Sequence, residues 1–234
     1  MTDANRLASL LARLPPSPDH PNILKAAFPD NGQLQLHLEK LGVPQLEMYL
    51  VWIAPDRFTA FEEVGKGGFA TVYKGTVSFQ DRKGEREKSF ALKELRKEMV
   101  PELVMSAVLT FCDRQGNALP INELIGLTRH PTNGDYLMVS RFSQHGALEY
   151  KQMTNWRHVA KFACRLARRL STLHALGFSH NDLHPGNVAF AGRGNFHVAS
   201  DSWNKNGSVK LRKWDMGFAF VQMTHFNTQE NWNT

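Results

Sequence analysis

Apolar residues recur every three or four positions between Trp156 and Leu176, at Val159, Phe162, Ala163, Leu166, Leu170 and Leu173. This spacing predicts an amphipathic helix. The pattern stops at residues 180–187, a polar run that contains proline and glycine, and apolar residues resume at 188–190. We therefore expect a helix, an exposed loop and a strand in succession.

The first half of the chain carries shorter, strand-like runs. They are residues 61–64, 71–77, 90–93, 123–129 and 136–142. A glycine-rich segment joins the first pair, and Asn133-Gly134 lies between the last pair. Glycines between two strand-like runs favour a hairpin at 65–70, and Asn-Gly is a strong signal for a tight turn at 133–134.

The first 55 residues give a less definite pattern. The leucines at positions 7, 10, 11 and 14 would form one face of a short helix that Pro15 and Pro16 end. We favour packing of this helix on the rest of the chain over docking to a partner. The leucines at 34, 36 and 38 alternate as in a strand, whereas those at 34, 38 and 41 fit a helix that ends at Gly42. The sequence leaves this second choice open.

Four segments carry residues suited to phosphate and a divalent cation. The glycine-rich segment 65–72 lets backbone N–H groups approach phosphate oxygens closely. Lys93 supplies a point charge at the end of the third run. Asn187 in the polar loop and Asp215 in Asp-Met-Gly bring the oxygen ligands that Mg²⁺ prefers, and Asp182 in the same loop brings a carboxylate that can act as a base.

In this order the four segments resemble the signature set of the protein kinase superfamily, and the resemblance covers residues 56–220. It implies an α+β, bilobal fold with a five-stranded antiparallel N-lobe and a partial, mainly helical C-lobe. The implied domains are an N-terminal extension (1–55), the N-lobe (56–140) and the hinge with the partial C-lobe (141–234).

The resemblance also implies roles for single residues. Lys93 would hold the α and β phosphates of ATP, and Asp182 would accept the proton of the acceptor hydroxyl. Asn187 and Asp215 would bind Mg²⁺. Ser140 would lie at the back of the adenine pocket. Further nucleotide contacts are implied at Gly65, Gly67, Gly68, Val72, Ala91, Arg141, Ser143 and Ala189.

A helix glutamate that pairs with the lysine belongs to the same family pattern. Glu98 and Glu102 are the candidates, although both follow Lys93 sooner than the pattern leads us to expect. We favour Glu102. Its simpler interpretation is a solvated charge in the first turn of a helix, where the helix dipole favours an acid.

The chain departs from the family pattern at several positions. They are Ala70 for a glycine, Asn181 for an arginine, His184 for a lysine and Met216 for a phenylalanine. The change at 181 predicts activity that does not depend on a phosphate in the activation segment. Only a short tail follows Gly217, so we expect a domain truncated after Asp-Met-Gly. The apolar face of the 156–176 helix would then need a partner to cover it.

Composition narrows the remaining choices. The 234 residues are 42% hydrophobic, enough for a sizeable core. The net charge is +6, and the lysines and arginines are interspersed with acidic residues. We read this as a solvated surface and expect no nucleic-acid partner. Cys112 and Cys164 are too few for a disulfide framework, and no apolar run approaches a membrane span. We therefore expect a cytoplasmic protein without membrane contact.

Three functions fit these observations. The leading one is an ATP-dependent protein kinase, of the tyrosine-kinase-like kind, that phosphorylates a protein substrate. The second is a small-molecule kinase, because residues 182–187 also resemble the loop of aminoglycoside and choline kinases. The third is a non-catalytic nucleotide-binding scaffold. The glycine hairpin and the strand that ends at Lys93 favour the first over the second.

Overall fold

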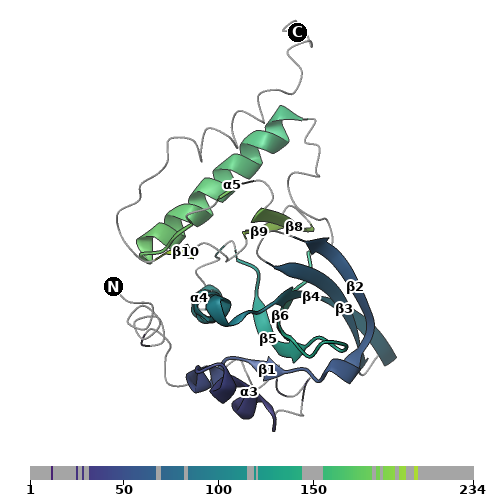
Figure 1. The fold of residues 1–234 in the computed structure, drawn as a ribbon. Coiled ribbons are helices and arrows are strands. Elements are labelled where there is room, and N and C mark those ends of the chain that lie inside the picture. Colours follow the sequence, from purple (N-terminus) through teal and green to yellow (C-terminus); the bar gives the residue numbers. More distant parts are fainter. Residues whose placement is uncertain are drawn as a thin grey trace, which may run out of the picture. The chain divides into compact units, whose positions relative to one another are not determined.

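The computed structural model divides the chain into two compact units (Figure 1), Met1–Gly116 with Asn122–Phe142 and Asn117–Ile121 with Ser143–Thr234. It describes residues 12, 25, 28, 32–66, 70–81, 84–114, 119, 121–143, 155–180, 183–184, 187–192, 195–198 and 203–204. We describe each unit by itself.

A six-stranded sheet in the order β1-β5-β6-β4-β3-β2 forms the first unit. Its strands are β1 (Val51–Trp52), β2 (Phe58–Lys66), β3 (Thr71–Asp81), β4 (Gly84–Glu94), β5 (Leu124–Arg129) and β6 (Tyr136–Arg141). Strands β2 to β6 are antiparallel neighbours, as predicted, and Gly134 (φ 75°) lies in the connection between β5 and β6.

The prediction of five strands is wrong by one, because β1 adds a sixth strand in parallel to the β5 edge. Val51 lies opposite Gly126, and Trp52 lies opposite Leu127. A Cβ at position 126 would run into the carbonyl oxygen of Val51, so the glycine permits this close approach. Two residues are too few for a periodic signal, and for this reason the pattern did not reveal the strand.

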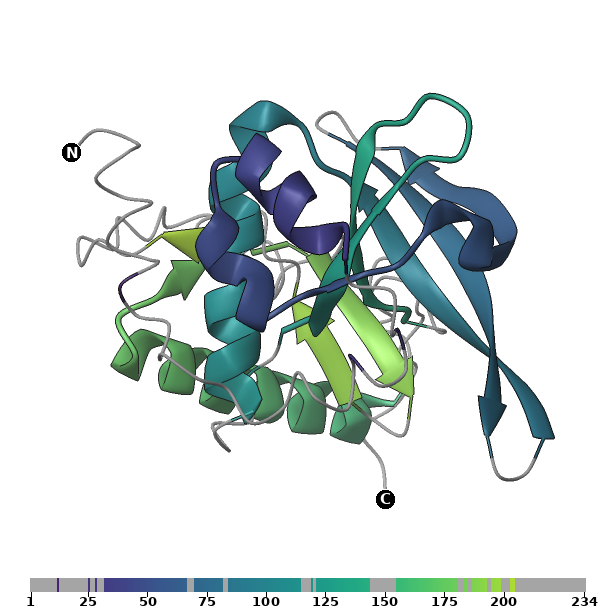
Figure 2. The ribbon, with the colours of Figure 1, turned by 90° about the horizontal axis from the view of Figure 1, so that it is seen from below.

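Before β1 the chain is helical. The first helix, α3 (Leu34–Lys40), is followed by the 3₁₀ helix η1 (Pro44–Met48), and η2 (Pro55–Arg57) follows β1. This settles the choice at residues 34–41 in favour of a helix, because Leu34 and Leu38 are buried while Leu36 is half exposed. Figures 1 and 2 show α3 close to α4 (Val100–Cys112), which follows η3 (Lys97–Met99).

The N-terminal segment contributes to the core of the sheet. One buried cluster comprises Phe28, Val51, Ile53, Val77, Phe90, Leu92, Ile125, Leu137 and Val139. The first three of these precede β2. The ring of Phe28 meets the rings of Phe79 and Phe90 edge-on, at centroid distances of 5.3 and 6.3 Å. The segment before residue 56 therefore shares its core with the strands that follow.

Helix α4 is enclosed more fully than a surface helix. All residues from Leu103 to Thr110 are buried, whereas a surface helix keeps one polar face in water. Tyr49, directly after η1, packs edge-on against Phe111 with 6.3 Å between ring centroids. The N-terminal segment thus covers part of this helix.

His37 on α3 is a buried titratable group at the contact between the N-terminal segment and the sheet. Its ring stacks on Trp52 at 3.9 Å, and its Nδ1 lies 3.0 Å from the hydroxyl of Tyr136. Burial, with the positive charges of Arg129 and Lys40, holds the pKa of His37 below its usual value of 6.5. The neutral imidazole is therefore the form that this contact favours.

We expect the folded chain to lose stability as the pH falls below about 6.5, the usual pKa of histidine. In that range His37 is protonated in the unfolded chain but still neutral in the folded chain, so each further fall in pH favours unfolding. The loss of stability begins at the pKa of the unfolded chain and is complete below the lower pKa of the folded chain. Denaturant unfolding at pH 7.5 and 5.5 measures the effect. His37→Gln should reduce the pH dependence and His158→Gln, on an exposed residue, should not. An equal loss in wild type and His37→Gln would contradict the assignment.

The second unit contains α5 (Trp156–Ala175), β7 (Ser179–His180), β8 (Val188–Gly192), β9 (Asn195–Val198) and β10 (Trp203–Asn204). The predicted helix is confirmed, and the side chain of Asn155 caps it by accepting from the Arg157 N–H at 2.9 Å. Strand β8 pairs with β9, and β7 pairs with β10. Within the described ranges no helix is long and apolar enough to cross a bilayer.

Candidate functional site

The register of the sheet gathers several predicted site residues on one face. Lys93 on β4 lies opposite Val72 on β3 and opposite Met138 on β6. Two residues earlier, Ala91 lies opposite Ser140. Directly opposed residues and alternate residues of a strand share a face. Val72, Ala91, Lys93 and Ser140 are thus brought together as the sequence predicted.

Helix α4 supplies the acidic partner of Lys93. The Nζ of Lys93 lies 2.8 Å from Oε1 of Glu102, and the two side chains are 18% and 8% exposed. The preference for Glu102 over Glu98 is confirmed, since Glu98 lies exposed in η3. The simpler interpretation of Glu102 as a solvated charge is wrong. An ion pair this buried contributes more to position than to stability, because desolvation offsets much of the attraction.

The glycine-rich hairpin is anchored at its base by a residue that sequence reasoning missed. Glu94, directly after Lys93, accepts hydrogen bonds from the Thr71 N–H (3.0 Å) and from the Tyr73 hydroxyl (3.2 Å). Burial raises the pKa of Glu94, but these hydrogen bonds and Arg96 outweigh it and hold the pKa below its usual value. The ladder places Gly65 opposite Val72, and Gly67 and Gly68 lie outside the described residues.

The predicted hinge at Arg141 is bound on one side by residues just before β5. The guanidinium of Arg141 contacts Glu123, and the hydroxyl of Ser140 accepts a hydrogen bond from Asn122 at 2.9 Å. Sequence reasoning missed Asn122 and Glu123. The order of the strands contained a signal for them. Both residues directly precede β5, which pairs with β6, so they lie next to the end of β6.

The second unit holds the remaining predicted residues. Asn187 is half-buried, and its backbone N–H donates to the carbonyl of His184 at 2.9 Å, which closes a turn before β8. Ala189 lies in β8, opposite His197 of β9. Ser143 is half-buried at the start of this unit. Asp182 and Asp215 lie outside the described residues.

A cation site is not visible among the residues that the structure describes. Within those residues, no group of three or more His, Cys, Asp or Glu side chains could hold a metal ion. Of the two expected Mg²⁺ ligands, Asn187 is described, whereas Asp215 lies outside that description, as does the expected base Asp182. The proposed Mg²⁺ ligands therefore rest on the sequence.

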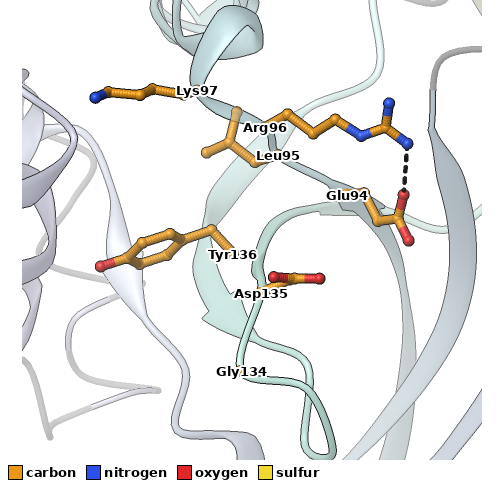
Figure 3. Close-up of a pocket in the computed structure, with 7 residues that line it drawn as sticks. All are labelled: Glu94, Leu95, Arg96, Lys97, Gly134, Asp135 and Tyr136. Carbon is orange, nitrogen blue, oxygen red and sulfur yellow. Dashed lines mark ion pairs between the residues drawn. The ribbon is translucent and has the colours of Figure 1, made fainter.

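A surface pocket of about 450 Å³ lies in the first unit, at the end of β4 and beside the connection from β5 to β6 (Figure 3). It is lined by Glu94, Leu95, Arg96, Lys97, Gly134, Asp135 and Tyr136. Arg96 turns toward Glu94, with 3.6 Å between charged atoms, and the charges around the pocket are mixed. None of the predicted site residues lines this pocket, so it is separate from the strand face that carries Lys93.

The sequence profile of the protein tyrosine and serine/threonine kinase family matches residues 58–205, more than half of the chain. The chain belongs to this kinase family. No curated protein matched the sequence. The matched region begins with β2 and includes Lys93, Glu102, Asp182 and Asn187, and it ends before Asp215. Membership makes phosphoryl transfer the general chemistry of this kinase.

Proposed function

We propose that this kinase transfers the γ-phosphoryl group of MgATP to a hydroxyl group of a protein substrate. The observation that carries the proposal is the ion pair between Lys93 and Glu102. It holds an ammonium group on the same strand face as Val72 and Ala91. A fixed positive charge beside an apolar face suits a ligand that joins a flat base to phosphates.

Each of the predicted site residues would have its own role in the transfer. Lys93, held by Glu102, would bind the α and β phosphates, and backbone N–H groups near Gly65, Gly67 and Gly68 would approach them. Asp182 would take the proton of the attacking hydroxyl while ADP leaves with the electrons of the broken P–O bond. Bound Mg²⁺ would neutralise charge on the phosphates.

The identity of the aspartate that binds Mg²⁺ has two candidates. The sequence favours Asp215, but the family match ends before it and includes Asp201. Asp201 is therefore the alternative to Asp215.

The other two functions gain less support. The family match covers the glycine hairpin and Lys93, and it does not favour a small-molecule kinase. A non-catalytic scaffold would retain nucleotide binding without transfer, and the assay below separates it from the proposed enzyme. A protein partner over the apolar face of α5 and a cytoplasmic location stay proposals.

We expect the chain to transfer label from γ-³²P-MgATP to a generic protein substrate, and Asp182→Asn to lower the rate by about 10²-fold or more, as for loss of a general base. Asp135→Asn is the matched control, because Asp135 is exposed in the connection between β5 and β6. The same assay with Asp201→Asn and Asp215→Asn identifies the metal ligand. The variant that lacks the ligand should need a far higher Mg²⁺ concentration for half-maximal transfer, and the other should not.

Two results would contradict the proposal. Equal rates for wild type and Asp182→Asn would remove Asp182 from the chemistry. Saturable MgATP binding by the wild type, without transfer to any protein, would favour the scaffold.

A further inference from the structure

Two residues just before β5 hold the end of β6. The amide of Asn122 donates to Ser140 Oγ at 2.9 Å, and Ser140 Oγ donates in turn to the Ala91 carbonyl at 3.5 Å. The carbonyl of Glu123 accepts from the Arg141 N–H at 3.1 Å. Backbone and side chain of the β6 end are therefore both engaged from the side of β5.

The carboxylate of Glu123 also binds two arginines. Its Oε2 lies 2.5 Å from Nη2 of Arg141, and its Oε1 lies 3.0 Å from Nη2 of Arg114, just beyond α4. The side chains of Glu123 and Arg114 are 19% and 15% exposed. Hydrogen bonds between ions of opposite charge are the stronger kind, and removal of one partner from a half-buried set leaves the others poorly satisfied.

The charge on Glu123 is stable at neutral pH. Burial raises the pKa of this carboxyl group, but Arg114 and Arg141 outweigh burial and hold the pKa below its usual value. Glu123 is therefore an anion between two cations, and it ties the segment after α4 to the end of β6.

We infer that Asn122 and Glu123 are positioning residues that fix Ser140 and Arg141 and thereby set the affinity and the base selectivity for the nucleotide. The inference rests on the proposed function and on the nucleotide contacts that the sequence predicts at Arg141 and Ser143, with Ser140 at the back of the base pocket. Because Glu123 takes up both the N–H and the guanidinium of Arg141, it holds the backbone and the side chain of this residue together.

The effect should appear in nucleotide binding and much less in the rate of transfer. A base is selected by hydrogen bonds from a backbone held in place, and displacement by about 1 Å is enough to lose them. Glu102 and Arg114 are twelve positions apart on the helical segment, which corresponds to about 18 Å. The ion pair that would hold the phosphates is thus far from Arg114, one of the two arginines that Glu123 binds.

The test measures KM and kcat for ATP and GTP in the full chain. We expect Glu123→Gln to raise KM for ATP about tenfold, the order of one lost charge-assisted hydrogen bond, and to narrow the preference between ATP and GTP. The kcat should stay within about twofold. Combined with Arg141→Leu, the change should add little, because both substitutions break the same contact. Glu39→Gln, on an exposed residue of α3 that accepts a hydrogen bond from Gln35 at 3.1 Å, is the control.

Asn122→Ala is the second variant, because it removes only the hydrogen bond to Ser140 and leaves both arginine contacts in place. It should also raise KM and narrow selectivity. A wild type that shows no saturable use of ATP would overturn the proposed function and this inference together. A wild type that saturates, with unchanged KM and selectivity in both variants, would overturn the inference alone. A fall in kcat at constant KM would assign the two residues a structural role and would also overturn it.

Discussion

Lys93→Ala is expected to reduce phosphoryl transfer by at least about 10²-fold, because the variant loses the charge that faces the phosphates. It should also lower the free energy of unfolding by about 3 kcal/mol, the usual cost of removing one partner of a buried ion pair. The pair with Glu102, 2.8 Å long and largely buried, is the structural basis for both effects. Initial rates and denaturant unfolding measure them separately.

A double variant separates the two roles of the lysine. Lys93→Met with Glu102→Leu replaces both ions by apolar side chains of similar size, which is often neutral for stability. We expect it to unfold near the wild-type midpoint and to stay inactive. Recovery of activity together with stability would show that Lys93 serves the fold alone. Thermal stabilisation by MgATP, absent in both variants and present in the wild type, is the accompanying binding assay.

Phe28→Ala is expected to lower the free energy of unfolding by about 3 kcal/mol, as for other buried phenylalanines cut to alanine. Phe28 is 4% exposed and lies edge-on to Phe79 and Phe90 in the core of the sheet. The substitution leaves a cavity and removes two aromatic contacts. Denaturant unfolding followed by tryptophan fluorescence measures the loss.

Leu36→Ala is the matched control for Phe28→Ala. Leu36 belongs to the same N-terminal segment but is 50% exposed, so its truncation should change stability by no more than about 0.5 kcal/mol. A similar, small effect for both variants would mean that the segment before β1 is not part of the core. The expected contrast would show that the kinase sheet depends on residues outside the 58–205 match.

These residues make the N-terminal segment more than an appendage. It covers the β5 edge through Val51 and Trp52, and it packs against α4 through Tyr49. An uncovered edge strand would present unpaired backbone groups to other chains, which favours aggregation. Helix α4 also carries Glu102. A segment that packs on this helix therefore helps to hold Glu102 in position beside Lys93.

Several elements could be predicted because their signals are local. The apolar spacing from 156 to 175 repeats over five turns, and Asn133-Gly134 has a strong turn preference of its own. The common face of Ala91 and Lys93 follows from the alternation of a single strand. Each of these features depends on residues a few positions apart, so it is visible in the sequence.

The missed residues depend on contacts between distant segments. Glu94 binds Thr71 and Tyr73, and Glu123 binds Arg141, at separations of 18 to 23 positions. No local pattern marks such partners, because the path of the chain between them decides whether they meet. The same reason applies to β1, where two residues pair with a strand more than seventy positions later.

The sequence by itself determined the kinase family, the hairpins, the helix α5 and the face of the strand that carries Lys93. Only the tertiary structure decided that Glu102 pairs with this lysine, that residues 34–40 are helical, and that Phe28 and Ile53 join the core of the sheet. The physical reason is range. Turn chemistry and periodicity act between neighbours, whereas ion pairs and core packing act between segments that folding brings together.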